Sequence, residues 1–124
     1  AAVGHAGAQY YLAMIYERGA GVPRDIAAAL NLYRQSATNG YSEAGVVLGN
    51  YYTDGVEVKQ DHAEAFVWYS VATAQGHRVA EVFRNSARRK LTAQQSVEAE
   101  RRARAILASR PNAEDATVPS DAYR

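Results

Sequence analysis

Apolar residues recur every four positions in two successive segments near the start of the chain. They are Ala8, Leu12 and Tyr16 in the first segment, and Ala29, Tyr33 and Ala37 in the second. Residues at this spacing share one face of an α-helix, so the pattern predicts two amphipathic helices. Gly19 and Gly40 follow the two segments and are expected to end the helices, because glycine readily adopts the left-handed conformation found after a helix C-terminus.

The same plan returns 36 residues further along the chain. A shift of 36 positions gives 11 identities over positions 4–40 without a gap. The matching residues of the second unit include Ala44, Leu48, Tyr52, Gly55, Asp61, Ala65, Tyr69 and Gly76. Repeats of this length predict a solenoid of helix–turn–helix units, here residues 4–39 and 40–76. Ala1–Val3 align with the end of a second helix, so we expect a preceding repeat to contact the exposed face of the first helix.

Residues 78–109 keep the helical spacing but lose the loop that separates the two helices in each earlier unit. We expect one helix over 78–90 and another over about 93–108, forming a C-terminal cap with a polar outer face. The apolar residues expected to face inward in this pair are Val79, Val82, Phe83, Ala87, Val97, Ala103, Ile106 and Leu107.

Polar residues at the expected helix starts support these boundaries. Asp25 and Asp61 are N-cap candidates, because a carboxylate can accept hydrogen bonds from the free N–H groups of the first turn. Asp61 and Glu64 have the spacing of a capping box, as do Thr92 and Gln95.

Composition and charge narrow the possible functions. The 124 residues carry a net charge of +1. The sequence contains no cysteine, which excludes disulfides and thiolate chemistry. The longest apolar runs are far too short to span a membrane. Residues 1–77 carry a net charge of −3, residues 78–110 carry +6, and residues 111–124 carry −2. The polar segment 110–124 contains two of the three prolines and is predicted to be a disordered tail.

No motif for catalysis, metal binding or cofactor binding emerges from the sequence. The three histidines, His5, His62 and His77, lack the spacing of a zinc motif, and we expect no metal or cofactor. Asp25 and Asp61 are explained as helix caps. The remaining carboxylates weighed as catalytic candidates are interpreted as solvated surface groups: Glu17, Glu43, Asp54 and Glu57. The sequence therefore predicts a protein that is not an enzyme.

The residues between 8 and 25, followed by Ala29, Leu32-Tyr33 and Gly40, resemble a Sel1-like repeat. The second unit resembles another such repeat, but has Glu57 where a loop glycine is usual. This family is related to tetratricopeptide repeats, and the resemblance implies an all-α, right-handed α–α superhelix. It also implies a scaffold or adaptor that binds a protein or peptide. Many bacterial members are periplasmic or exported, so the resemblance favours that location for a chain whose localisation is otherwise unknown.

Tetratricopeptide-like folds bind partners through the first helix of each repeat, which lines the concave side. Transferring this by register gives a set of expected partner-binding positions that differ between the units, whereas the apolar positions repeat. They are Tyr10, Met14, Glu17, Arg18, Val46, Asn50, Thr53, Asp54, Val82, Ser86, Arg89 and Lys90.

Two alternatives remain open from the sequence. One is binding of nucleic acid or an anionic surface through basic residues of the last two helices. These residues are Arg84, Arg88, Arg89, Lys90, Arg101, Arg102 and Arg104. Nucleic acid is the less favoured partner, because no aromatic residues are interleaved with them for base stacking. An acidic protein and the chain's own acidic segment 111–124 are further alternatives as partners of this cluster. The other alternative is a structural spacer within a larger protein.

Overall fold

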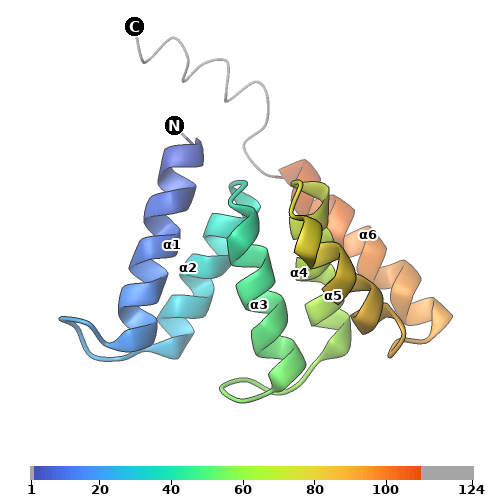
Figure 1. Ribbon diagram of the computed structural model, residues 1–124, viewed down its shortest axis with the longest axis horizontal. Helices are drawn as coiled ribbons and strands as arrows, with labels where there is room; N and C mark the ends of the chain where they lie inside the picture. Colours follow the sequence, from blue (N-terminus) through green and yellow to red (C-terminus); the bar gives the residue numbers. More distant parts are fainter. Residues whose placement is uncertain (1, 110–124) are drawn as a thin grey trace, which may run out of the picture.

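Six helices follow one another along residues 2–109, the part of the chain that the computed structural model describes (Figure 1). They are α1 (Ala2–Arg18), α2 (Ile26–Thr38), α3 (Ser42–Asp54), α4 (His62–Ala74), α5 (Arg78–Arg88) and α6 (Ala93–Ser109). No strand occurs within this range. The prediction for residues 110–124 lies outside the described residues.

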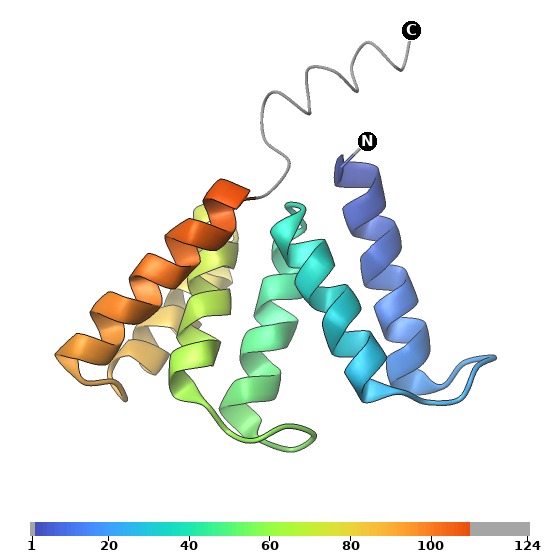
Figure 2. The same ribbon diagram turned by 180° about the vertical axis from the view of Figure 1, so that it is seen from behind.

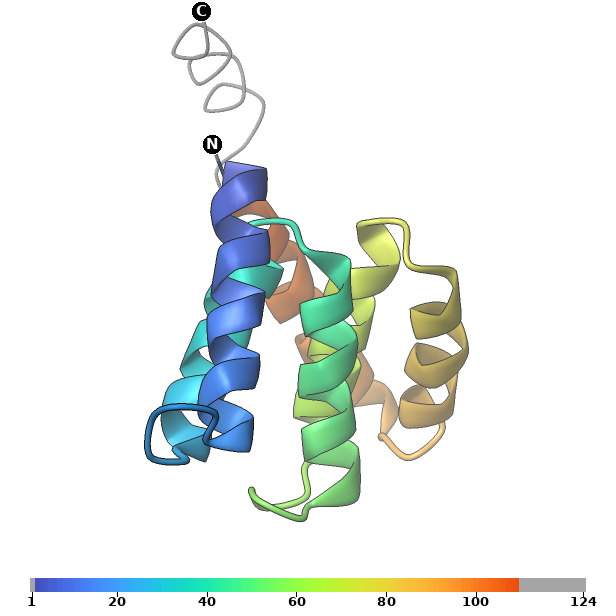
Figure 3. The ribbon, with the colours of Figure 1, turned by 60° about the vertical axis from the view of Figure 1, so that its left-hand side comes forward.

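The helices form two layers. The first helix of each pair, α1, α3 or α5, lies in one layer, as the views in Figure 1 and Figure 3 show. The second helices, α2, α4 and α6, form the other layer, seen from behind in Figure 2. Each of α2 and α4 packs against the helix before it and the helix after it, and α6 packs on α4. The predicted all-α repeat solenoid is confirmed.

The predicted caps fix the helix boundaries. Asp25 and Asp61 have extended backbones, and each accepts a hydrogen bond of 3.0 Å from the backbone N–H three residues later. Thr92 and Gln95 form a reciprocal capping box, with hydrogen bonds of 2.8 and 3.1 Å. The box expected at Asp61 is only half formed. The side chain of Glu64 turns away from the cap, to Trp68 and to α6.

Small residues let the helices approach closely enough to enclose large ones. Tyr33, Leu48 and Phe66 are almost completely buried. At Gly49 on α3, a Cβ atom would lie only 2.2 Å from the ring of Tyr69. The glycine is therefore needed for α3 to pack against that ring, and Tyr69 fills the space left by the absent side chain.

Alanine, rather than valine, forms the inner face of α5 and α6. Ala80 and Ala87 are buried on α5, as are Ala99 and Ala103 on α6. The expectation that Val79, Val82 and Val97 face inward is wrong, because their side chains are 53%, 66% and 65% exposed. Phe83, also expected to face inward, is 36% exposed and has one side of its ring near that of Tyr69, with centroids 5.5 Å apart. Ile106 and Leu107 are partly buried as expected. The alanines of α5 and α6 face the large side chains of α4. These large side chains fill the space between the helices, so valines would not fit at the alanine positions.

The start of α1 also differs from the expectation. The alignment places Ala1–Val3 at the end of a separate helix that closes at Gly4. In the structure α1 begins at Ala2 and runs through Gly4 without a break. In the second unit, Gly40 has a φ of +109° and forms the turn between α2 and α3. The described residues include no helix before α1 that would impose such a turn at Gly4.

The outer face of α1 is exposed where the matching face of α3 is buried. Ala44 and Leu48 on α3 are fully buried, and α3 packs against α2. The equivalent residues of α1, Ala8 and Leu12, are exposed. Leu12 is 43% exposed and Leu48 is 0% exposed. Two leucines at the same repeat position therefore have different environments.

This pair gives a test of the repeat register. We expect Leu48→Ala to lower the free energy of unfolding by about 2–5 kcal/mol, because it opens a cavity in the core. Leu12→Ala is expected to cost about 1 kcal/mol or less, because its side chain is already in contact with solvent. Urea unfolding followed by circular dichroism measures both changes. Equal losses at the two positions would contradict the packing described here.

Candidate functional site

The expected partner-binding residues lie on α1, α3 and α5 or, for Arg89 and Lys90, directly after α5, but they differ in accessibility. Those exposed are Arg18, Asn50, Asp54, Val82, Arg89 and Lys90. Those partly buried are Tyr10, Met14, Glu17, Thr53 and Ser86. Val46 is buried and packs with Ala72 and Ala80, so its side chain is not available to a partner. Tyr10 packs against the rings of Tyr33 and Tyr41, which turns it toward the core.

A hollow of about 400 Å³ lies between α1 and α3 and brings three of the expected residues together. Glu17 comes from α1, and Asn50 and Asp54 come from α3. The remaining lining residues were not expected from the sequence: Arg24, Val47, Tyr51, Val56 and Glu57. Val56 is 79% exposed at this site. The hollow thus offers carboxylates, an amide and apolar surface within one concave site, which we call the α1–α3 groove.

Glu17 is held in place by two tyrosines. Its Oε1 accepts a hydrogen bond of 2.8 Å from the Tyr33 hydroxyl, and its Oε2 accepts one from the Tyr51 hydroxyl. Burial raises the pKa of both phenols above the ordinary value, and the hydrogen bonds to the carboxylate raise it further. Glu17 is therefore not the solvated surface group that its sequence position indicated. Its carboxylate joins α1, α2 and α3.

Arg24 and Glu57 close one end of the α1–α3 groove. Arg24 donates to the Glu57 carboxylate at 2.7 Å and, through Nε, to the backbone carbonyl of Glu17 at 3.0 Å. The hydrogen bond and the charge of Glu57 raise the pKa of Arg24 above its ordinary value. Glu57, where the first unit has Gly21, thus links the loops of the two units. The spacing of residues along the sequence gives no signal for this contact.

A smaller hollow of about 50 Å³ brings together expected residues of α3 and α5. Thr53, Ser86 and Lys90 line it, beside the ring of Tyr69. The Tyr69 hydroxyl donates to Asn50 Oδ1 at 2.7 Å and lies 3.1 Å from Thr53 Oγ1. Burial raises the pKa of this phenol. Tyr69 therefore has the same role under α3 that Tyr33 has under α1.

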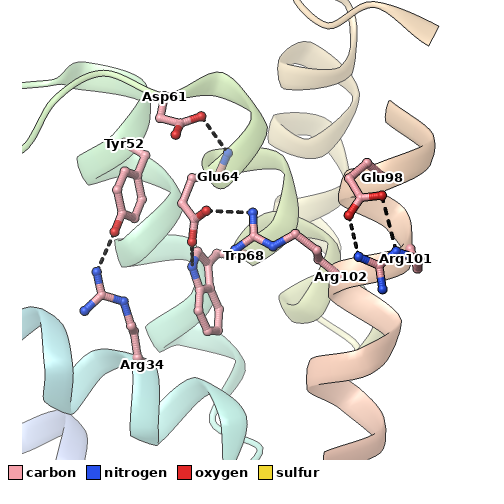
Figure 4. A network of polar contacts seen from close by, with 8 residues as sticks. All are labelled: Arg34, Tyr52, Asp61, Glu64, Trp68, Glu98, Arg101 and Arg102. Carbon is pink, nitrogen blue, oxygen red and sulfur yellow. Dashed lines mark hydrogen bonds and ion pairs between the residues drawn. The ribbon is translucent and has the colours of Figure 1, made fainter. Parts of the chain in front are cut away.

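The basic residues of the last two helices are spread over several surfaces. Arg102 reaches from α6 to Glu64 on α4, with an N–O distance of 2.9 Å, and Glu64 also accepts a hydrogen bond from Trp68 (Figure 4). Arg101 pairs with Glu98 on the exposed side of α6 (Figure 4). These pairs neutralise part of the cluster locally, whereas Arg89 and Lys90 are exposed and have no ion pair within residues 5–109.

Residues 5–109 contain no group of three histidine or carboxylate side chains that could hold a metal ion. No helix in the described part of the chain has the length and apolar character needed to cross a membrane.

Comparison with known families agrees with the observed repeat. The model of the Sel1 repeat matches residues 6–41 and 43–77, which together make up more than half of the chain. The chain belongs to the Sel1 repeat family. Each match covers one helix pair, α1–α2 or α3–α4. Sel1 repeats generally serve as scaffolds for protein interaction, so the family also supports protein binding as the general role.

A solved structure shares this fold. The crystal structure of a protective antigen present in uropathogenic Escherichia coli strains, which displays an SLR fold, matches with a TM-score of 0.76 and 28% sequence identity. The match covers 93% of this chain and 25% of that one, so this chain spans a quarter of the length of the antigen. The right-handed α–α superhelix expected for the Sel1 repeat is supported by this similarity. No curated protein matches the chain.

The contacts of Glu17 predict its contribution to stability. Glu17→Ala leaves the hydroxyls of Tyr33 and Tyr51 without their acceptor, so we expect a loss of about 1–3 kcal/mol in the free energy of unfolding. Asp54→Ala, on the exposed side of the same groove, should change it by no more than about 0.5 kcal/mol. Urea unfolding distinguishes the two. Similar values would show that Glu17 is an ordinary surface residue.

The raised pKa values of Tyr33 and Tyr51 predict a loss of stability in alkaline solution. Above about pH 10 the unfolded chain releases phenolic protons that the folded chain retains. The unfolded state then binds fewer protons, so the free energy of unfolding falls as pH rises. Urea unfolding at pH 8 and pH 11 should show this fall, and Tyr33→Phe should reduce it. A decline that is unchanged in Tyr33→Phe would contradict the assignment.

Proposed function

We propose that this Sel1 repeat protein is a non-enzymatic scaffold that binds a protein or peptide on the surface of α1, α3 and α5. The observation that carries the proposal is the α1–α3 groove, which combines carboxylates with the exposed apolar side chain of Val56. Mixed polar and apolar concave surfaces of this kind favour recognition of a peptide or loop.

Differences between the repeat units support this role. Arg18 and Asp54 at the ends of α1 and α3 are equivalent by register to Lys90, two residues after α5, and the three positions do not all carry the same charge. All three side chains are exposed. The buried tyrosine position, by contrast, is the same in the first two units. The scaffold is thus repeated, whereas the surface that a partner would contact varies along the solenoid.

We also propose that the outer face of α1 packs against a further repeat. Of its exposed apolar residues, Leu12 matches Leu48, which is fully buried on α3, and Tyr11 and Ile15 match Val47 and Tyr51, which are partly buried. A helix with the character of α2 would cover them in the same way. Residues 78–109 would then form the cap at the other end, where the outer side of α6 is rich in charged residues.

Site-specific photo-crosslinking tests the binding surface. A photoreactive amino acid at Asn50 should crosslink to a discrete partner protein in extract of the source organism. The same group at Ala105, exposed on α6 in the other layer, serves as the control. We expect the crosslink at Asn50 to persist at physiological salt and to disappear with Asp54→Lys. Crosslinking that is equal at both positions, or absent from both, would argue against the first-helix surface.

A further inference from the structure

Some of the basic residues converge at one place outside the surface proposed above. A hollow of about 300 Å³ lies between α5 and α6, with α4 as its floor. Arg84 and Arg88 of α5 and Arg104 of α6 line it, together with a single acidic residue, Glu100. We call it the α5–α6 trough. Its volume is at the lower end of the range typical of ligand pockets.

Among the described residues, two of the three arginines lack a close carboxylate partner. Arg88 pairs with Glu100 at 3.1 Å, and its guanidinium lies 5.5 Å from the centre of the Phe66 ring. Arg84 has only Glu81, at 3.8 Å on the same helix and 59% exposed, which makes a weak pair. No ion pair joins Arg104 to another residue of 5–109. The lining therefore carries unbalanced positive charge.

Unsatisfied polar atoms mark the same trough. Ser70 Oγ and Arg84 Nε are shielded from solvent and have no hydrogen-bond partner among the described residues. Leaving such atoms without partners is unfavourable. The side chains of Arg88 and Arg104 are exposed. Because Ser70 and Arg84 both line the trough, an acceptor bound there would lie near these atoms.

We propose that the α5–α6 trough binds a carboxylate side chain from an acidic segment of a protein partner. A carboxylate accepts two parallel hydrogen bonds from one guanidinium, which matches the donors of Arg84 and Arg104. Glu100 on Arg88 shows that a carboxylate fits this environment. Leu107, at the apolar side of the trough, would contact an aliphatic neighbour of the acidic residue.

The distribution of charge favours an acidic protein segment over nucleic acid. Binding along a nucleic-acid backbone requires basic side chains in a stripe. Here Arg101 and Arg102 are paired elsewhere on α6. The one aromatic ring in the trough, Phe66, is buried, so it cannot stack on a base. Arg104 and the weakly paired Arg84 meet in one small hollow, whereas Arg89 and Lys90, which also lack an ion pair within residues 5–109, lie outside it.

The trough is separate from the proposed first-helix surface, although α5 contributes to both. Arg84 follows Val82 by two residues, and Arg88 follows Ser86 by two. Two residues correspond to a rotation of about 200° around an α-helix, so the arginines lie on a different face. Binding in the trough is therefore independent of binding on the face of Val82 and Ser86, and the two can be tested apart.

Nuclear magnetic resonance of the arginine side chains tests the proposal. The ¹⁵N-labelled chain would be titrated at physiological salt with a blocked peptide of sequence GLEELG, and separately with GLQQLG as the uncharged control. We expect saturable shifts of the Nε–Hε signals of Arg84 and Arg104 with the acidic peptide alone. The Arg84→Gln/Arg104→Gln double variant should weaken binding at least tenfold.

A matched double variant controls for net charge. Arg89→Gln/Arg101→Gln removes two positive charges, one directly after α5 and one on α6, both outside the trough, and should change affinity less than twofold. Circular dichroism checks that both variants are folded, and Arg104→Gln alone, at an exposed position, provides a milder change. Equal weakening by both double variants, or equal shifts with GLQQLG, would overturn the proposal. Tighter binding of an oligothymidylate than of GLEELG would also overturn it.

Discussion

The hydroxyl groups of two buried tyrosines constrain the rest of this fold. Tyr33 and Tyr69 occupy the same repeat position and are almost completely buried between their helix pairs. A buried phenol hydroxyl needs a hydrogen-bond partner, because leaving the hydroxyl buried and unpaired is unfavourable. The partners come from the first helices: Glu17 from α1, and Asn50 and Thr53 from α3. The core of each repeat is therefore completed by side chains that also border the proposed binding surface.

This arrangement divides the surface residues into fixed and adaptable groups. Glu17 and Asn50 are held by the tyrosines, so a partner would meet them already positioned and lose little side-chain entropy on contact. Arg18 and Asp54 are exposed beside them and are free to differ without disturbing the core. A repeat protein can thus vary its recognition residues while its helices keep the same packing.

The sequence predicted the repeat, the N-caps Asp25 and Asp61 and the capping box of Thr92 and Gln95, because each of these rests on local chemistry. It misplaced the start of α1, where the alignment indicated a break at Gly4. Asp25 and Asp61 cap helices through bonds three residues away, and the 36-residue shift exposes both positions at once. Orientation in the last two helices was less predictable. Val82 and Val97 fit a helical stripe, but the buried stripe is made of alanines, and helical spacing alone does not show which stripe meets α4. The role of Glu17 was missed because its partners lie 16 and 34 residues away.

The alanine stripe of α5 also explains how one short helix can serve two surfaces. Ala80 and Ala87 use only a narrow part of its circumference for contact with the core. Larger inward residues would need a wider buried face and would draw neighbouring positions into it. Because the contact is narrow, Ser86 lines the hollow beside α3 and Arg88 lines the trough beside α6. The choice of alanine at the core therefore determines how much of α5 can be used for recognition, and the charged residues on either side can change without altering its packing.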